Sequence, residues 1–334
     1  MDAIKQIKQL AKLGFTLAAS QFGEHNRPNT EPKLWVLNYH RILPKTDGRY
    51  TLEEPGMVVT PQVFSMHLQE AKKLFELVSL TEWLAKANSG GSLPAKACAI
   101  TFDDGWLDNY QYALPILQQQ QVPATLFAVA DKIGTLFRFW PNIVSELIAL
   151  KSTALRNHPL LADAAHLIEV PYSVERVADC ILQLKVYSED QLFTALEAID
   201  WSTELAEATP ALMDWNQLAA MQQSGLIDIG SHTCTHRRLN KGLEPSVLDY
   251  EIATSRTRME QQLGQPIPLF CFPNGEYNSE VLERVQFTYQ AAVTTQAGIN
   301  RLKSLQRHEL LRIRLHNDAS NTPAKFRARL SGWR

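Results

Sequence analysis

The sequence predicts an α/β fold, a (β/α) barrel of about seven parallel units with a helical insertion. Three observations predict it: short apolar segments rich in β-forming residues recur along the chain, helical patterns separate several of them, and one long segment has helical patterns but no clear strand. Strands that alternate with helices form parallel βαβ units. The expected strands are residues 34–39, 97–102, 124–129, 226–230, 268–272, 291–294 and 311–315.

Composition and charge restrict the function classes. The chain has 334 residues, of which 45% are hydrophobic and 20% charged, values typical of a globular chain with a sizeable core. Its formal net charge is −2, without the basic excess of a nucleic-acid binder. No apolar run reaches the length of a membrane span. The four cysteines are scattered and form no C-x-x-C pair, which is typical of a reducing compartment and indicates neither a disulfide framework nor a zinc ribbon.

The first expected element is a basic amphipathic helix over residues 1–22. Lysines interrupt its apolar residues, whereas a secretory signal has an unbroken apolar stretch before its cleavage site. Such a helix either rests on an anionic membrane surface or packs on the domain that follows. We expect residues 1–33 to be this helix and a linker, and residues 34–334 to be the barrel. The apolar face comprises Ile4, Ile7, Leu10 and Ala11, and the lysines are Lys5, Lys8 and Lys12.

Helical patterns follow the first strand and recur later in the chain. Apolar residues at three- and four-residue spacing predict a helix over 61–77. Another helix is expected over 246–263, with Ser246 after Pro245 as its N-cap. Between the third and fourth strands we expect a helical insertion at about 136–212. Its helical patterns lie at 143–150, 174–184 and 189–199.

The motif Thr101-Phe102-Asp103-Asp104-Gly105 ends the strand at 97–102. Two adjacent carboxylates repel each other when both are ionised, and a bound cation or hydrogen-bond donors offset this cost. The pair is therefore expected where a metal sits, and Gly105 lets the chain turn sharply after it. Taken alone, an Asp-Asp-Gly sequence is more often an ordinary turn.

The motif His232-Thr233-Cys234-Thr235-His236 follows the strand at 226–230. Two histidines four residues apart can converge on one metal, and imidazole nitrogen suits zinc, iron, cobalt or nickel. Cys234 would point away if both histidines share a face, so we expect it to be buried and inert. Taken alone, this segment is equally typical of a surface histidine pair.

The two motifs are more specific together than apart. Both lie at the carboxyl ends of predicted parallel strands, the face where barrels collect their catalytic residues. One aspartate and two histidines form a catalytic ligand set that leaves positions open for water and substrate. The other aspartate is then free to act as a base on that water.

Further strand ends supply candidate groups that, taken singly, are more often structural. The turn Pro273-Asn274-Gly275 can aim backbone N–H groups into a cleft, where they would hold an oxyanion. His40 follows the first strand and His316 the last, and either can act as a general acid near neutral pH. Aromatic side chains that could stack on the rings of a ligand, but are more often core, are Trp106, Trp140, Trp201 and Trp215.

These residues together resemble the polysaccharide deacetylase family, which shares the NodB-type domain of carbohydrate esterases. The motifs at 101–105 and 232–236 match its first two motifs fully, and 270–275 matches the third in part. The resemblance covers about 34–315 and implies a distorted (β/α)7–8 barrel. It also implies roles: Asp103 as catalytic base, Asp104, His232 and His236 as metal ligands, Thr233 as a brace for the histidine loop, and Asn274 as backbone donor to the oxyanion.

Two departures from the family pattern affect the expected site. The third motif usually carries an arginine that contacts the catalytic base, and Cys271 occupies that place, so Arg312 or Arg314 is the candidate substitute. Most members take the general acid from a late strand, which corresponds to His316. A branch that deacetylates poly-N-acetylglucosamine takes it from an early Y-H sequence, which corresponds to His40. We favour His40.

The resemblance implies a metal-dependent hydrolase of linear amides that removes acetyl groups from N-acetylated sugars of a polysaccharide or glycan precursor. Zinc is the expected cofactor, and the ligand set also suits nickel, cobalt or iron. The expected partner is an acetylated glycan and no nucleic acid, with membrane contact through residues 1–22 as an option; the expected location is the cytoplasm or the inner face of the membrane. Two alternatives are a deacylase or deformylase acting on a lipid-linked sugar, and a carbohydrate-binding protein with an impaired site.

Overall fold

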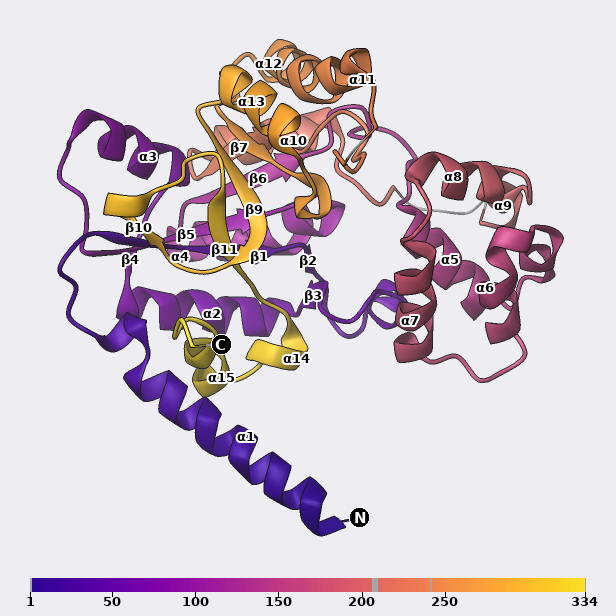
Figure 1. Ribbon diagram of the computed structural model, residues 1–334, viewed down its shortest axis with the longest axis horizontal. Coiled ribbons are helices and arrows are strands. Elements are labelled where there is room, and N and C mark those ends of the chain that lie inside the picture. The colour runs from indigo at the N-terminus through magenta and orange to yellow at the C-terminus, as the bar shows by residue number, and fades with distance from the viewer. Residues whose placement is uncertain (1, 206–209, 241, 334) are drawn as a thin grey trace.

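The computed structural model describes residues 2–205, 210–240 and 242–333. Within these residues, seven parallel strands close into a barrel (Figure 1), which confirms the expected fold class with seven units. β1 pairs with β5 from Lys33–Lys96 to Tyr39–Phe102 and with β11 on its other side, so the sheet has no open gap. In order around the barrel the strands are β1 (Lys33–Tyr39), β5 (Lys96–Phe102), β6 (Ala124–Ala128), β7 (Ile227–Ser231), β8 (Leu269–Cys271), β9 (Ala291–Ala297) and β11 (Leu310–Arg314).

Shorter strands and helices complete the chain. β4 (Glu76–Leu77) pairs with β5, β10 (Asn300–Arg301) pairs antiparallel with β1, and β2 (Arg41–Ile42) pairs with β3 (Val58–Val59). The helices are α1 (Asp2–Phe22), α2 (Pro61–Leu74), α3 (Leu80–Ser89), α4 (Leu114–Gln120), α5 (Trp140–Ala149), α6 (Ala162–Leu167), α7 (Val174–Leu184), α8 (Glu189–Glu197), α9 (Trp201–Glu204), α10 (Trp215–Gln223), α11 (Pro245–Asp249), α12 (Ser255–Leu263), α13 (Ser279–Thr288), α14 (Asn317–Ser320) and α15 (Pro323–Arg329).

Two helix predictions need correction. The helix expected over 61–77 ends at Leu74, because β4 pairs with β5 and draws the following residues into the sheet. The helix expected over 246–263 begins one residue earlier, with Pro245 in its first turn and Glu244, not Ser246, as N-cap. Proline suits that first turn because its missing N–H would have no helical partner there. A π-helical turn at Tyr250–Thr254 separates α11 from α12.

Alternate strand residues face opposite sides of the barrel wall. One buried cluster joins Trp35 and Leu37 of β1 to Phe64 of α2 and Phe326 of α15, so these strand residues face the surrounding helices. Another cluster joins the alternate residues, including Leu34, Val36, Leu269, Cys271 and Leu310, to Trp83 of α3, and these strand residues therefore face the barrel interior.

Helices α5–α9 form a lobe beside the barrel (Figure 1), between the third and fourth barrel strands as expected. The lobe has its own buried cluster, which includes Leu147, Ile181 and Leu196. Residues 206–209 of the expected insertion lie outside the described residues. Since the strands on both sides of the lobe pair with each other in register, the insertion leaves the barrel wall intact.

Helix α1 projects away from the barrel, and its C-terminal end contacts α15 (Figure 1). No helix among the described residues is long and apolar enough to cross a membrane.

Candidate active site

The carboxyl end of β5 places two carboxylates at the mouth of the barrel. The backbone N–H of Asp103 donates to the Tyr39 carbonyl of β1 at 3.1 Å, which continues the strand pairing by one residue. The chain then turns through φ values of 76° at Asp104 and 84° at Gly105. Such values suit glycine and are strained for aspartate, and strain of this kind concentrates at functional sites. The turn points the two carboxylates in different directions.

Asp104 faces both histidines of the second motif. Its Oδ1 lies 3.4 Å from Nε2 of His232 and 3.5 Å from Nε2 of His236. Its Oδ2 accepts a hydrogen bond from Nε1 of Trp106 at 2.8 Å. Burial raises the pKa of Asp104, but the hydrogen bond from His232 and the nearby histidine charges outweigh it and hold the pKa below its ordinary value.

The histidines are held by their own loop and by a neighbouring carboxylate. Nδ1 of His232 lies 2.8 Å from the Cys271 carbonyl, so this nitrogen donates, and Nε2, which faces Asp104, is the nitrogen that would bind a metal. The backbone N–H of His236 donates to the hydroxyl of Thr233 at 2.9 Å, the bracing contact expected for Thr233. Thr233 and His236 both have positive φ. Buried Glu251 accepts from the backbone N–H groups of Cys234 and Thr235.

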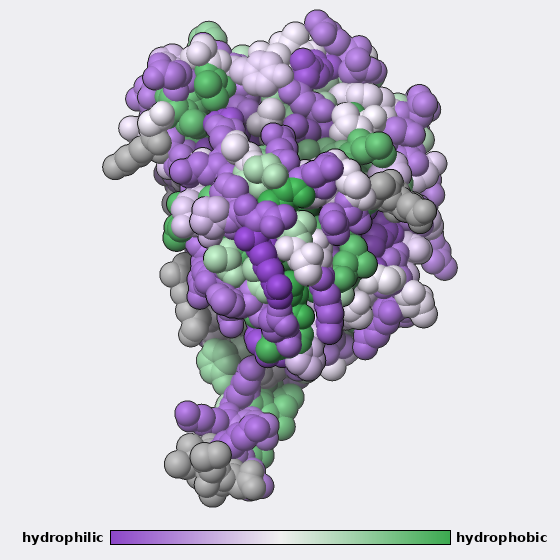
Figure 2. Space-filling model, turned by 90° about the vertical axis from the view of Figure 1, so that its right-hand side faces the viewer, coloured by the Kyte–Doolittle hydropathy of each residue, from purple (hydrophilic) through white to green (hydrophobic). Residues whose placement is uncertain are grey.

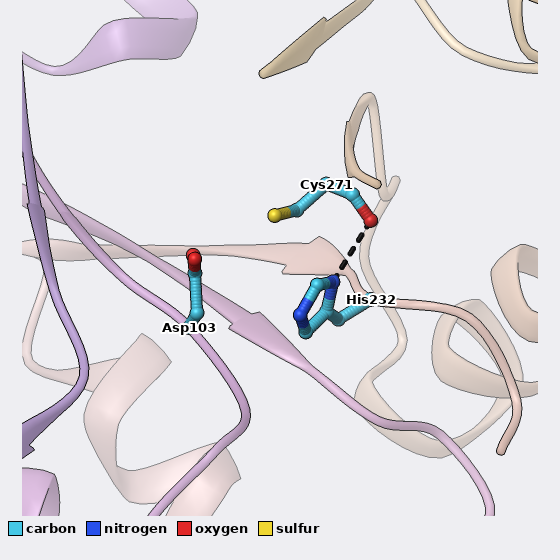
Figure 3. Close-up of side chains that lie close together, drawn as sticks. All are labelled: Asp103, His232 and Cys271. Atoms are coloured by element: carbon cyan, nitrogen blue, oxygen red, sulfur yellow. Dashed lines mark hydrogen bonds between the residues drawn. The ribbon is translucent and has the colours of Figure 1, made fainter. Parts of the chain in front are cut away.

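Two groups of side chains among the described residues have atoms close enough to share a metal. They are Asp104 with His232 and His236, and Asp103 with His232 and Cys271. Figure 3 shows the second group, with the Cys271 sulfur directed toward the side of Asp103 and the Cys271 carbonyl bonded to His232. Burial raises the pKa of the Cys271 thiol, which disfavours the thiolate that a metal needs. The Arg312 guanidinium, 3.4 Å from that sulfur, would repel a cation. The donor chemistry therefore favours the first group.

Arg312 is the arginine that reaches Asp103. Its Nη1 and Nη2 donate to the two carboxylate oxygens at 2.7 and 2.8 Å, and its Nε donates to the Thr294 carbonyl. Both side chains of the ion pair are buried. Burial raises the pKa of Asp103, but the Arg312 charge outweighs it and keeps the carboxyl ionised. Arg314, the other candidate, instead bonds the Gly56 carbonyl, so the alternatives resolve to Arg312.

The two candidate acids lie in different surroundings. Nε2 of His40 is 3.8 Å from Oδ2 of Asp103, and His40 lines the cleft above the barrel. Burial lowers the pKa of His40, while the charges of Asp103 and Asp104 oppose that effect. His316 is not among the described residues that line this cleft, and its Nδ1 faces Asp318 at 3.5 Å.

Asn274 lines the same cleft from the turn after β8. Its φ of 54° and ψ of 5° break the short 3₁₀ turn at Pro273–Gly275. The following Gly275 has φ 71°, and a Cβ there would lie 2.0 Å from the Thr295 hydroxyl, so only glycine fits. This turn fixes the direction of the Asn274 backbone.

A buried ionic network supports the site from the end of β1. Arg41 donates to Asp108 at 2.8 and 3.0 Å and to Glu53 at 2.5 Å, and all three side chains are at most 3% exposed. The Arg41 guanidinium also lies over the Trp106 ring, 4.1 Å from its centre. Trp106 donates to Asp104, so the network reaches the metal-ligand set. Sequence reasoning missed these roles; a charged residue next to His40 was the available signal.

The cleft has a volume of about 510 Å³ and lies between the barrel and the helical lobe. Trp106 and Trp140 line it, although both are almost fully buried. Trp201 packs against the core of the lobe and Trp215 against the main core, as expected for structural tryptophans. Arg238, close to His236 in the chain, donates to Glu189 and to the Lys185 carbonyl of the lobe. Cys234 is buried, as expected.

Comparison with known proteins places these features in a family. The sequence model of the polysaccharide deacetylase family matches residues 90–292. YxkH of Bacillus subtilis (strain 168), which carries the name of a polysaccharide deacetylase, is 27% identical over 279 residues, 80% of this chain and 66% of its own length.

Solved structures share the fold at lower identity. The Streptococcus pyogenes deacetylase PplD, determined with acetate, is 20% identical with a TM-score of 0.59, covering 91% of this chain and all of the other. IcaB from Ammonifex degensii is 18% identical with a TM-score of 0.58, and the match covers 89% of this chain and 97% of IcaB. The family match spans more than half of the chain and includes both motifs that build the mouth of the barrel. This chain therefore belongs to the polysaccharide deacetylase family.

Proposed function

We propose that this chain removes acetyl groups from N-acetylated sugars by metal-dependent hydrolysis of the amide bond. The observation that carries the proposal is the convergence, in one cleft, of a three-residue ligand set and a separate buried carboxylate held by an arginine. Membership of the family supports the general reaction. The alternative of an impaired carbohydrate-binding protein loses its only support, because Arg312 occupies the position that the missing third-motif arginine would serve.

Asp104, His232 and His236 would hold the metal. One aspartate and two histidines suit zinc, and also nickel, cobalt or iron. A divalent cation there would polarise the acetyl carbonyl and lower the pKa of a water. The Cys271 carbonyl fixes the ring of His232, and Trp106 fixes the carboxylate of Asp104, so two of the three ligands are oriented before any cation arrives.

Asp103 acts as the base. Its carboxylate stays ionised beside Arg312 and accepts the proton of the attacking water. Because both carboxylate oxygens are bonded to Arg312, the side chain keeps one orientation. It lies next to Asp104 in the chain, yet the turn at Asp104 separates base and ligand.

Asn274 and His40 act on the acyl group and the leaving group. The backbone N–H of Asn274 donates to the oxyanion that forms as the carbonyl is attacked. His40 donates a proton to the departing sugar nitrogen, which leaves as an amine while acetate is released. Burial lowers the pKa of His40, which makes its imidazolium a stronger acid, and the charges of Asp103 and Asp104 only partly oppose that shift.

The substrate is an acetylated glycan. The cleft walls carry Phe137 and Phe193, which supply apolar surface for sugar rings. The early Tyr39-His40 sequence resembles the branch that deacetylates poly-N-acetylglucosamine, which makes oligomers of N-acetylglucosamine the first substrates to assay. A lipid-linked sugar is the second candidate, favoured by the exposed apolar residues of α1.

Substitutions at Asp103 and Asp104 distinguish the role of the base from that of a metal ligand. Asp103→Asn should bind metal like the wild type but release acetate from N-acetylated oligosaccharides about 10²–10⁴-fold more slowly. Asp104→Ala should lose both bound metal and activity. Asp318→Asn, an exposed aspartate beside His316, is the matched control and should keep both. Wild-type rates in both site variants would refute the mechanism. A panel of acetylated glycans and lipid-linked sugars, with metal added back, then identifies the substrate.

A further inference from the structure

Helix α1 is attached to the domain through small residues near its C-terminal end. Ala19 and Ser20 are buried, and the helix packs there against α15. The following Glu24 donates its backbone N–H to the Ser331 carbonyl and pairs with Lys33, which fixes the base of the helix. Beyond this base α1 projects from the body of the molecule, as two views at right angles show (Figures 1 and 2).

The large apolar residues of α1 from Leu10 onward remain exposed. A helix that serves only to pack on its own domain buries its large apolar side chains. Among the residues of α1 whose side chains the structure describes, the buried ones are small and the large ones face solvent, with exposed fractions of 48–68%, while Ile4 and Ile7 of the expected apolar face lie outside that set. Their spacing of three to four residues places Leu10, Leu13 and Leu17 along one side of the helix. The exposed set is Leu10, Leu13, Phe15, Leu17 and Phe22.

Beyond Asp2 at its first position, the charged side chains of the helix are all lysines. Lys5, Lys8 and Lys12 are exposed, and their spacing places them in one stripe on the polar side of the helix, away from the leucines. Residues 3–23 contain no aspartate or glutamate. A second copy of α1 would bring lysine against lysine, whereas the headgroups of anionic lipids are complementary to this stripe. An apolar side combined with a polar side that carries lysines is typical of helices that lie in the membrane interface.

We propose that α1 docks the protein on the surface of an anionic lipid membrane, with Leu10, Leu13 and Leu17 in the acyl boundary and its lysines at the headgroups. The helix lies on the membrane and does not span it, in agreement with its low overall hydropathy. The proposal is independent of the proposed reaction, because it rests on residues outside the cleft.

Vesicle flotation of the full chain tests the proposal. Wild-type protein should float with vesicles of phosphatidylcholine and phosphatidylglycerol (3:1) and much less with phosphatidylcholine alone. The variant K5Q/K8Q/K12Q should bind the anionic vesicles about 100-fold more weakly, from about a tenfold effect or less for each lysine near the surface. The variant L10S/L13S/L17S should lose binding to both kinds of vesicle.

The control variant K45Q/K86Q/K303Q removes the same number of charges from three exposed lysines outside α1. It should float like the wild type. Far-UV circular dichroism and acetate release from a soluble substrate report whether the variants are folded, and both should stay unchanged. Three results would overturn the proposal: no flotation of the wild type, equal loss in the control variant, or a dimer by light scattering that only the α1 variants dissociate, since α1 would then bind a second copy.

Discussion

Replacing Arg312 with methionine tests the contact that holds the proposed base. Methionine fills much of the same space and removes both hydrogen bonds to Asp103. The side chains of Arg312 and Asp103 are 1% and 4% exposed, so bulk water cannot replace the lost partner. Removing one partner of a buried ion pair typically costs about 3–5 kcal/mol, because the remaining charge is buried without compensation. We expect a loss of that order in the free energy of unfolding at neutral pH, measured by urea denaturation.

The loss should depend on pH in a defined direction. Arg312 outweighs burial and keeps the pKa of Asp103 below its unfolded value of about 3.9, so the pair contributes stability that is present above about pH 4 and lost as the pH falls through the folded-state pKa. Without Arg312, burial raises that pKa, and the variant loses stability as the pH rises. The difference between the two proteins therefore widens from acid to neutral pH. The acid limb of kcat/KM should move to higher pH, because the base must be ionised.

Two further variants make this reasoning testable even if the first one folds poorly. Arg314→Met removes an arginine from the same strand that does not contact Asp103, and it should keep the wild-type acid limb. Arg312→Met combined with Asp103→Asn leaves no buried unpaired charge, so it should be more stable than Arg312→Met alone, although inactive. Wild-type stability and an unmoved acid limb in Arg312→Met would refute the reasoning.

The other predictions concern the ligand set and the acid. Trp106→Phe removes the N–H that bonds Asp104, so metal affinity measured by calorimetry should fall about 10–100-fold, while kcat at saturating metal changes less; unchanged affinity contradicts the role given to this contact. His40→Ala should lower kcat for acetate release by about 10²–10⁴-fold and His316→Ala by only a few-fold, and the reverse order would make His316 the acid. Treatment with a chelator should abolish acetate release, and added Zn²⁺ should restore it; full activity in protein shown by elemental analysis to be metal-free argues against the metal site.

The barrel strands were predictable because parallel strands buried on both faces are short apolar runs. Each of the seven expected segments overlaps a barrel strand, and their limits differ by no more than a few residues from those observed. Helix ends were less predictable, since they depend on tertiary partners. Phe75 and Leu77 continue the apolar spacing of α2, yet β4 pairs with β5 and ends the helix first.

The residues of the candidate site also differ in how far the sequence alone predicts them. Asp103, Asp104, His232 and His236 occur in two short motifs whose spacing is local, so the sequence identifies them directly. The network of Arg41, Glu53 and Asp108 joins residues that are far apart in the chain, and only the fold brings them together. Arg312 had a signal of its own: an arginine within a buried strand needs a buried partner, and the alternation of the strand turns it toward the barrel interior.

Cys271 and Arg312 together account for the departure from the third family motif. Both side chains occupy positions that face the barrel interior, on strands separated only by β9. Nη2 of Arg312 lies 3.4 Å from the Cys271 sulfur, so the side chains of these two strands are in contact inside the barrel. What Asp103 requires is a guanidinium at this point, and a long side chain from β11 delivers it as well as one from β8 would. A second arginine at position 271 would have to share one carboxylate in a buried space, leaving a positive charge uncompensated. A small, neutral thiol at position 271 avoids this uncompensated charge, so it is compatible with an arginine on β11.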